Sequence, residues 1–190
     1  MGLDMYLIRK KYVGANYDFR KVTGKIEIEI GGKKLPIEFN RISYIQEEAC
    51  YWRKANAIHK WFVENVQNGE DDCKSYYVST EDLQKLLDLC KKVKEVAVIK
   101  DGKVKSGSKY NKEKDVWEPI YEDGSYIDNE EDISDLLPTS DGFFFGSTEY
   151  DQWYMQDIDY TIERLEQILK EEKEMNDLGF YSDFEYHASW

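Results

Sequence analysis

The longest amphipathic pattern in the sequence is an apolar stripe with helical spacing near the C-terminus. Its members recur at intervals of four and three residues: Tyr154, Ile158, Ile162, Leu165 and Leu169. That period is typical of an amphipathic helix with one buried face. Ser147 and Thr148 precede the stripe as candidate N-caps, and Glu149 and Asp151 would then lie in the first turn, where acids oppose the helix dipole favourably.

Two more segments carry the same period. Residues 49–67 contain a helical stripe, and Asn68-Gly69 follows as a stop signal. The members of that stripe are Tyr51, Ala55, Ile58, Phe62 and Val66. Ser79 and Asp82 approximate a capping box before the next stripe, which predicts a helix to about residue 93. Its members are Leu83, Leu86, Leu87, Cys90 and Val93.

Other segments have the pattern of strands. Residues 2–10 alternate loosely, and residues 25–39 predict a hairpin that turns at Gly31-Gly32. Residues 97–107 predict a second hairpin that turns at Asp101-Gly102, and residues 180–190 predict a closing strand. The apolar run 143–145, bounded by two glycines, predicts a short strand buried on both faces.

Residues 102–135 turn polar, with only isolated aromatic and aliphatic anchors, and we interpret them as a long loop or insertion. With that exception the pattern predicts one α+β domain over residues 1–190. We expect a mostly antiparallel sheet with about three helices packed on it. A length of 190 residues and a hydrophobic content of 41% suit one such domain.

Composition limits the function classes. The sequence has neither a signal-peptide pattern nor an apolar run of membrane-spanning length, so we expect a cytoplasmic protein that does not bind membranes. Three cysteines without metal-ligand spacing predict neither a zinc site nor a disulfide framework. P-loop, dinucleotide-binding, GxSxG and HExxH motifs are missing, and we expect no cofactor and no resident metal.

The charge is strongly negative and unevenly distributed. The formal net charge is −13, and residues 121–159 contain twelve acidic residues and no Lys or Arg. Residues 85–114 contain ten lysines against four acids, so we expect a polarised molecule if the two segments occupy different surfaces. This balance argues against direct nucleic-acid binding and favours a basic protein partner. The predicted acidic interaction surface comprises Asp128, Glu130, Glu131, Asp132, Asp135 and Asp141. The alternative is a solvated acidic surface that aids solubility.

A second group of residues suggests a ligand- or partner-binding site. Polar and aromatic side chains gather before the C-terminal helix, and basic and amide side chains begin the stripe of residues 49–67. The two groups are Glu149, Tyr150, Asp151 and Trp153, and Arg53, Lys54, Asn56 and His59. If they converge, the basic groups could meet an anionic ligand such as a nucleotide while Trp153 and Tyr150 stack on its ring. The alternatives are ordinary capping acids, core aromatics and a hydrogen-bonded core histidine.

Three longer blocks resemble an uncharacterised family of proteins encoded by bacteriophages and prophages. The blocks are MGLDMYLIRKKYVG, YWRKANAIHKWFVENVQ and LLPTSDGFFFGSTEYDQWY. The resemblance implies a phage gene product that acts inside a bacterium, and it implies no reaction, cofactor or catalytic residue. By analogy, small phage accessory proteins often bind and block host machinery, including antiviral defence systems such as CRISPR nucleases.

Three functions therefore stand as hypotheses. The first is an acidic inhibitor of a basic host protein, and the second is a small-ligand or nucleotide-signal binding protein. The third is a hydrolase that uses His59 or a carboxylate-bound metal, and no motif favours it. The sequence favours binding over catalysis.

Overall fold

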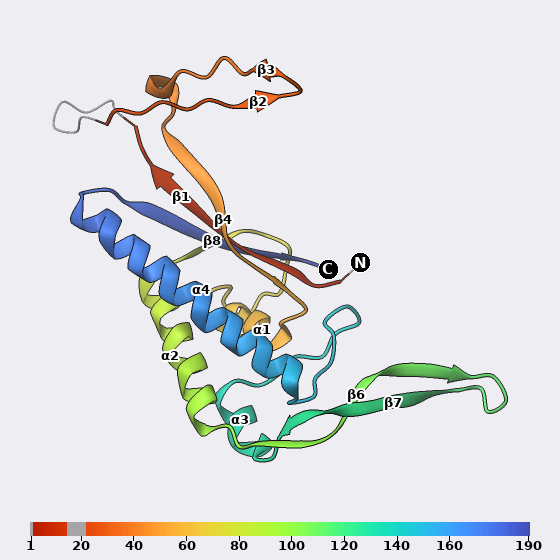
Figure 1. Ribbon diagram of the computed structural model, residues 1–190. Helices are drawn as coiled ribbons and strands as arrows, with labels where there is room; N and C mark the ends of the chain where they lie inside the picture. Colours follow the sequence, from red (N-terminus) through yellow and green to blue (C-terminus); the bar gives the residue numbers. More distant parts are fainter. Residues whose placement is uncertain (1, 15–21) are drawn as a thin grey trace.

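The computed structural model describes residues 2–14 and 22–190. Its body is built on a four-stranded antiparallel sheet with the strand order β4-β1-β8-β5 (Figure 1). The strands are β1 (Asp4–Tyr12), β4 (Tyr44–Arg53), β5 (Tyr76–Val78) and β8 (Ser182–Ser189). The predicted strand near the N-terminus and the predicted closing strand are both confirmed, and they pair with each other at the centre of the sheet.

Helices cover one face of this sheet (Figure 1). They are α1 (Asn56–Asn65), α2 (Thr80–Val96) and α4 (Gln152–Asp177). Alternate residues of β1, such as Met5 and Leu7, are buried against them, as a strand with one covered face requires. On α2, Ser79 accepts a hydrogen bond from the Asp82 amide at 3.1 Å, so the predicted cap is confirmed. The predicted single α+β domain describes this architecture.

Two ribbons extend from the body at opposite ends (Figure 1). The first pairs β2 (Glu29–Ile30) with β3 (Lys33–Lys34) and is followed by a short 3-10 helix, η1 (Phe39–Arg41). Gly31 and Gly32 have φ angles of +58° and +77°, as the predicted Gly-Gly turn requires. The second ribbon pairs β6 (Ile99–Asn111) with β7 (Val116–Ile127).

Two predictions are wrong in the region of the second ribbon. Residues 102–135 are not an irregular loop, because they form most of β6, all of β7 and most of α3 (Glu130–Leu136). Their interpretation as an insertion stays a prediction. The hairpin turns after Asn111 rather than at Asp101-Gly102, since Gly102 lies within β6 opposite Gly124. An exposed two-stranded ribbon needs no continuous apolar face, and periodicity therefore could not reveal it. With α3, the described residues contain four α-helices rather than about three.

The predicted helix over residues 49–67 begins too early. Residues 49–53 belong to β4, where Cys50 pairs with Leu7 and Trp52 pairs with Met5. Cys50 and Trp52 are both buried. They lie on the covered face of the sheet. The apparent stripe began too early because Tyr51 of β4 and Ala55 before α1 happen to keep helical spacing with Ile58.

The aromatic run near α4 also differs from the prediction. Residues 143–145 form a turn rather than a buried strand, and Phe143 is 95% exposed whereas Phe145 is only 6% exposed. The N-cap of α4 is Asp151, so neither Ser147 nor Thr148 begins the helix. The segment between residue 138 and Asp151 is therefore irregular and lies against the beginning of α1 through contacts described below.

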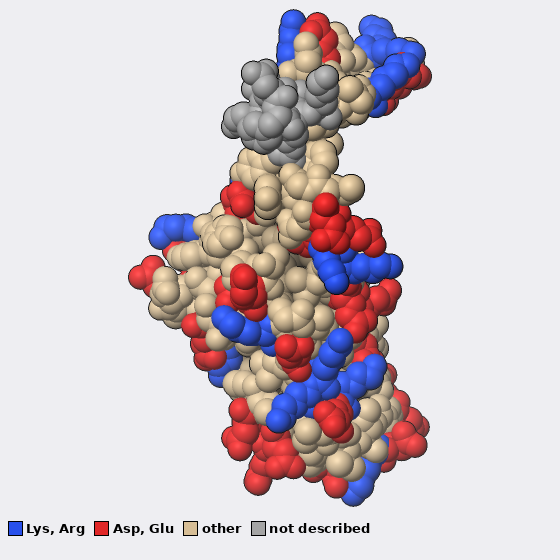
Figure 2. Space-filling model, turned by 90° about the vertical axis from the view of Figure 1, so that its left-hand side faces the viewer, with Lys and Arg blue, Asp and Glu red and all other residues tan. Residues whose placement is uncertain are grey.

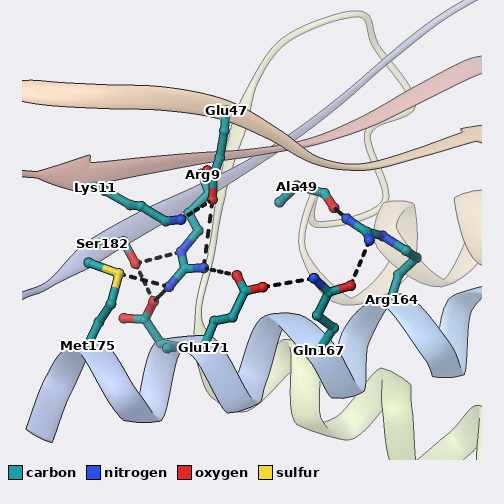
Figure 3. A network of polar contacts seen from close by, with 10 residues as sticks. Arg9, Lys11, Glu47, Ala49, Arg164, Gln167, Glu171, Met175 and Ser182 are labelled. Carbon is teal, nitrogen blue, oxygen red and sulfur yellow. Dashed lines mark hydrogen bonds and ion pairs between the residues drawn. The ribbon is translucent and has the colours of Figure 1, made fainter. Parts of the chain in front are cut away.

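A buried arginine joins the sheet to α4 (Figure 3). Arg9 on β1 is 0% exposed and donates to Glu172 at 2.6 Å, to Glu171 at 3.0 Å and to Ser182 at 3.1 Å. Its guanidinium also lies 5.5 Å from the centre of the Phe184 ring. Breaking such a fully partnered buried charge is costly, so this network stabilises the contact between β1, α4 and β8.

The two oppositely charged segments lie beside each other rather than on separate surfaces. Lys100 pairs with Asp128 at 2.7 Å and Lys103 pairs with Asp123 at 2.7 Å, because β6 and β7 are antiparallel neighbours. Figure 2 shows basic and acidic side chains interspersed over the face seen there. The polarised arrangement that the charge counts suggested is therefore not found. No helix in the described ranges is both long and apolar enough to cross a membrane.

Candidate functional site

A pocket of about 360 Å³ lies where the end of β4 meets the beginnings of α1 and α4. Six of the eight residues predicted for a ligand site line it: Arg53, Lys54, Asn56, Glu149, Asp151 and Trp153. They come from two segments about ninety residues apart in the sequence. The ligand-binding hypothesis required the two segments to meet at one pocket, and these six residues do so.

The corner after β4 is built around Lys54. This lysine has a φ angle of +61°, a backbone conformation that is uncommon outside glycine. Its amide donates to the Leu3 carbonyl at 2.8 Å, which ties the corner to the N-terminal strand. Gly146 approaches it closely, since a Cβ on Gly146 would lie 3.2 Å from the Lys54 Cβ. Residues held in rare conformations concentrate at functional sites, where the surrounding structure supports them.

Asn56 attaches the irregular segment before α4 to the first turn of α1. Its amide nitrogen donates to the carbonyls of Phe145 at 3.1 Å and Ser147 at 2.7 Å. Its carbonyl oxygen accepts from the Ser140 amide at 3.1 Å. These bonds occupy both ends of the side-chain amide, so Asn56 shapes the pocket wall rather than offering a free group to a ligand.

Asp151 lies at the base of the pocket and caps α4. It is 3% exposed, and its Oδ1 accepts from the amides of Trp153 at 2.8 Å and Tyr154 at 3.3 Å. Its Oδ2 is also buried and has no hydrogen-bond partner among the described residues. Burial raises the pKa of this carboxyl, and the charge of Glu149 raises it further.

Asp157 is a lining residue that the sequence analysis did not single out. It is half-buried in the second turn of α4, and within the described part of the chain its carboxyl group has no ion-pair or hydrogen-bond partner. Desolvation raises the pKa of Asp157 to about 7, and the charge of Asp151 contributes in the same direction. Asp157 directly precedes Ile158, which is a member of the apolar stripe. The sequence feature that could have indicated this residue is therefore an acid at the edge of that stripe.

The charges around the pocket are mixed. Two cationic side chains, Arg53 and Lys54, are exposed at the corner, and Arg53 makes only a long contact of 4.0 Å with Asp4. Three carboxylic acids line the other side: Glu149, Asp151 and Asp157. Trp153 is 51% exposed and offers an indole surface beside them. Such an arrangement of a few charged groups and one aromatic face is typical of a site for a small polar molecule.

Two predicted residues lie outside this pocket, and His59 is one of them. Its side chain is 1% exposed, with Nδ1 2.7 Å from the Tyr186 hydroxyl and Nε2 3.1 Å from Asp71. Burial lowers the pKa of His59 despite the opposing effect of Asp71. Because both ring nitrogens have partners, this arrangement matches the alternative of a hydrogen-bonded core histidine.

Tyr150 is the other. It is 7% exposed, its hydroxyl accepts from the Thr139 amide at 3.1 Å, and it lines a neighbouring hollow between β6, β7 and α3 that shares Glu149 and Asp151 with the first pocket. It therefore does not offer a stacking face to the pocket that holds Trp153.

The residues predicted for an acidic surface lie on or near α3. Asp128 pairs with Lys100, and Asp132 accepts from Asn129 at 3.0 Å. The other four are Glu130, Glu131, Asp135 and Asp141, and none of them has an ion pair within the described ranges. In Figure 2, acidic side chains are frequent at the lower end of the molecule, at the height that α3 has in Figure 1.

No group of three His, Cys, Asp or Glu side chains is placed to hold a metal ion within residues 2–14 and 22–190. Cys50 and Cys90 are buried, and burial raises the pKa of each thiol to about 12, which disfavours the reactive thiolate. Comparisons with family models, with curated proteins and with solved structures returned no match.

Proposed function

We propose that the protein acts by binding a small polar ligand in the pocket between β4, α1 and α4. The observation that carries this proposal is the convergence of Arg53 and Lys54 with Trp153 and unpartnered carboxyl groups in a space of about 360 Å³. That volume is at the lower end of the range for small-molecule sites, so the ligand has the size of a metabolite.

Catalysis by His59 is less well supported than binding. A general base needs a free nitrogen within hydrogen-bond reach of its substrate. Both nitrogens of His59 instead contact Tyr186 and Asp71, and the ring packs edge-on against Phe145 and Trp190. The hydrolase hypothesis is therefore not supported by His59, its main candidate residue.

The test is ligand-observed saturation-transfer NMR with a bacterial metabolite extract. The native protein is expected to give signals from one or a few bound small molecules. The comparison variant is Gln156→Trp, because Gln156 is an exposed residue on α4 that lines the pocket, and a tryptophan there adds a large side chain to the lining. Equal signals from both proteins, or none from the native protein, would contradict the proposal.

A second candidate function is docking of a basic protein on the acidic surface defined by Asp128, Glu130, Glu131, Asp132, Asp135 and Asp141. The observation in its favour is that Glu130, Glu131, Asp135 and Asp141 lack basic partners among the described residues. Unpaired exposed acids attract positively charged surfaces and accelerate association. If the protein is phage-encoded, as the resemblance implies, the partner would be a bacterial protein and the effect of binding would be inhibition.

This second candidate is tested by affinity capture from bacterial lysate with mass spectrometry. A basic protein captured at equal stoichiometry should be lost when Glu130, Glu131 and Asp135 are changed together to Lys. Capture should persist in the Gln156→Trp variant, since its pocket lies apart from α3. Unchanged capture by the triple variant would count against the acidic surface.

A further inference from the structure

The carboxyl groups of the pocket lack a counter-charge. Asp151 is more than nine-tenths buried, and its Oδ2 has no partner among the residues that the structure describes. The carboxyl group of Asp157 lines the same pocket without a partner of its own. Buried polar groups in folded proteins are nearly always hydrogen-bonded, and unpartnered ones call for an explanation such as an absent ligand.

The two cations of the pocket do not supply that counter-charge. Arg53 is the only one with an ion pair in the described ranges, and its partner is Asp4 rather than an acid of the pocket. Lys54 has none there, and both side chains are exposed at the corner after β4. The pocket therefore has a negative side on α4 and a positive side on the β4–α1 corner.

This layout argues against a simple anion as the ligand. The lining carries three acids and two bases, and His59, which would have added positive charge, lies elsewhere. A doubly charged phosphate without a cationic group would leave Asp151 and Asp157 without a partner. A ligand that carries both signs would complement both sides, and charge-assisted hydrogen bonds are the stronger kind.

We propose that the pocket binds a small zwitterionic amine, whose ammonium group meets Asp151 and Asp157 and whose anionic group meets Arg53 and Lys54. In this arrangement Trp153 lies beside the ligand and covers its apolar part. The anionic group is a carboxylate or a phosphate, which gives amino acids and amino phosphates as the two sources. This inference rests on the proposed small-ligand function and specifies the chemistry of that same site.

The pocket also gives the binding a defined pH dependence. The charged groups that line it with Asp157 are Glu149 and Asp151 before α4 and Arg53 and Lys54 at the corner, whereas α1 contributes Asn56, Ala57 and Ile58. An ammonium group prefers the ionised form of Asp157. Because the pKa of Asp157 is raised to about 7, affinity for the amine should rise as the pH passes through that value.

The experiment compares probes that differ only in the amine. Saturation-transfer NMR and isothermal titration are run with L-phenylalanine against 3-phenylpropionate and with phosphoethanolamine against ethyl phosphate. We expect at least one amine to bind about tenfold or more tightly than its matched partner. Preference for L-phenylalanine or for phosphoethanolamine identifies the source of the anionic group.

Two variants make the test specific. Asp157→Asn should lower the affinity for the amine about tenfold and abolish the rise in affinity between about pH 6 and about pH 8. Lys85→Ala is the control, because Lys85 is an exposed residue of α2 outside the pocket, and it should change neither. Thermal unfolding of each variant verifies that it is folded.

The outcomes separate this inference from the proposed function. If amine and matched partner bind equally, or if Asp157→Asn leaves the preference unchanged, the zwitterion inference is overturned while the pocket remains a small-ligand site. If every probe fails but the metabolite extract still gives signals that Gln156→Trp removes, the inference alone is again overturned. If the extract also gives no signal, both fail.

Discussion

The buried arginine of the sheet–helix core differs from the carboxyl groups of the pocket in one respect. Arg9 in the core is surrounded by partners, with two glutamates, a serine hydroxyl and an aromatic ring around one guanidinium. Asp151 and Asp157 in the pocket are also withdrawn from water, yet they have an oxygen or a whole carboxyl group without a partner in the described chain. A complete set of partners indicates a role in stability, whereas carboxyl oxygens without partners that line a pocket are placed to meet a ligand.

The largest effect is expected in the core. Arg9→Met should lower the free energy of unfolding by about 3–5 kcal/mol, because it leaves the buried Glu172 carboxylate without its cation. Urea unfolding measures the change. In the double variant Arg9→Met/Glu172→Met much of the loss should be recovered, since both charges are then gone. A loss no larger than that of the exposed control Lys85→Met would mean that the network contributes little.

The next effect is expected at the pocket wall. Asn56→Ala removes three hydrogen bonds that attach the irregular segment before α4 to α1, and should cost about 2–3 kcal/mol. Urea unfolding compares it with Asn65→Ala, which removes a single hydrogen bond to the Trp61 carbonyl. Similar losses in the two variants would show that Asn56 does not hold the segment in place.

Asp151 has one carboxyl oxygen with partners and one without, so its variants separate the two roles. Asp151→Ala removes the cap at Oδ1 and should cost about 1 kcal/mol of stability. Asp151→Asn keeps an oxygen for the cap and removes the charge at Oδ2, so it should lie within about 1 kcal/mol of the native protein. Thermal unfolding at one pH distinguishes them. If Asp151→Asn were much less stable than Asp151→Ala, the charge at Oδ2 would have a partner that this account lacks.

The smallest effect on stability is expected at Trp153. Because half of this side chain is exposed, Trp153→Ala should change the unfolding free energy by no more than about 0.5 kcal/mol. The same change should weaken binding of the small-molecule ligand, as saturation-transfer NMR would report. A large loss of stability would instead assign Trp153 to the core, which is the alternative that the sequence allowed.

The sequence predicted some elements of this molecule and missed others, and the burial of their residues explains the difference. The helices α2 and α4 each have one buried face, and the helical spacing of their apolar residues predicted them. The two glycines predicted the turn at Gly31-Gly32. The β6–β7 ribbon was missed because its exposed strands need no apolar alternation. The boundary at Lys54 was missed because Tyr51 in β4 and Ala55 after it lie four residues apart and continue the helical spacing of α1 backwards.

The site was predictable only in part, for a related reason. Local chemistry singled out Arg53, Lys54 and the residues around Asp151, but their convergence depends on tertiary contacts such as those of Asn56 with the segment before α4. His59 was included because its residue type suggests chemistry, yet its partners Asp71 and Tyr186 come from other elements. Asp157 was overlooked because a lone acid at the edge of an apolar stripe usually faces solvent.

The pH dependence of stability in Asp157→Asn tests directly whether the pocket holds an unpartnered carboxyl group. Because the native state holds the pKa of Asp157 at about 7, above its usual value, the native state binds this proton more readily than the unfolded state does. The native protein therefore loses stability from this group as the pH rises towards about 7, and the variant does not.

Urea unfolding of both proteins across this range gives the answer. We expect the variant to gain up to about 4 kcal/mol over the native protein by about pH 8, with the gain growing between about pH 4 and about pH 7. That result would mean that the native chain keeps a destabilising carboxyl group in its pocket, as a ligand-binding role explains. A variant that is less stable at pH 8, or a difference that does not change with pH, would contradict the account.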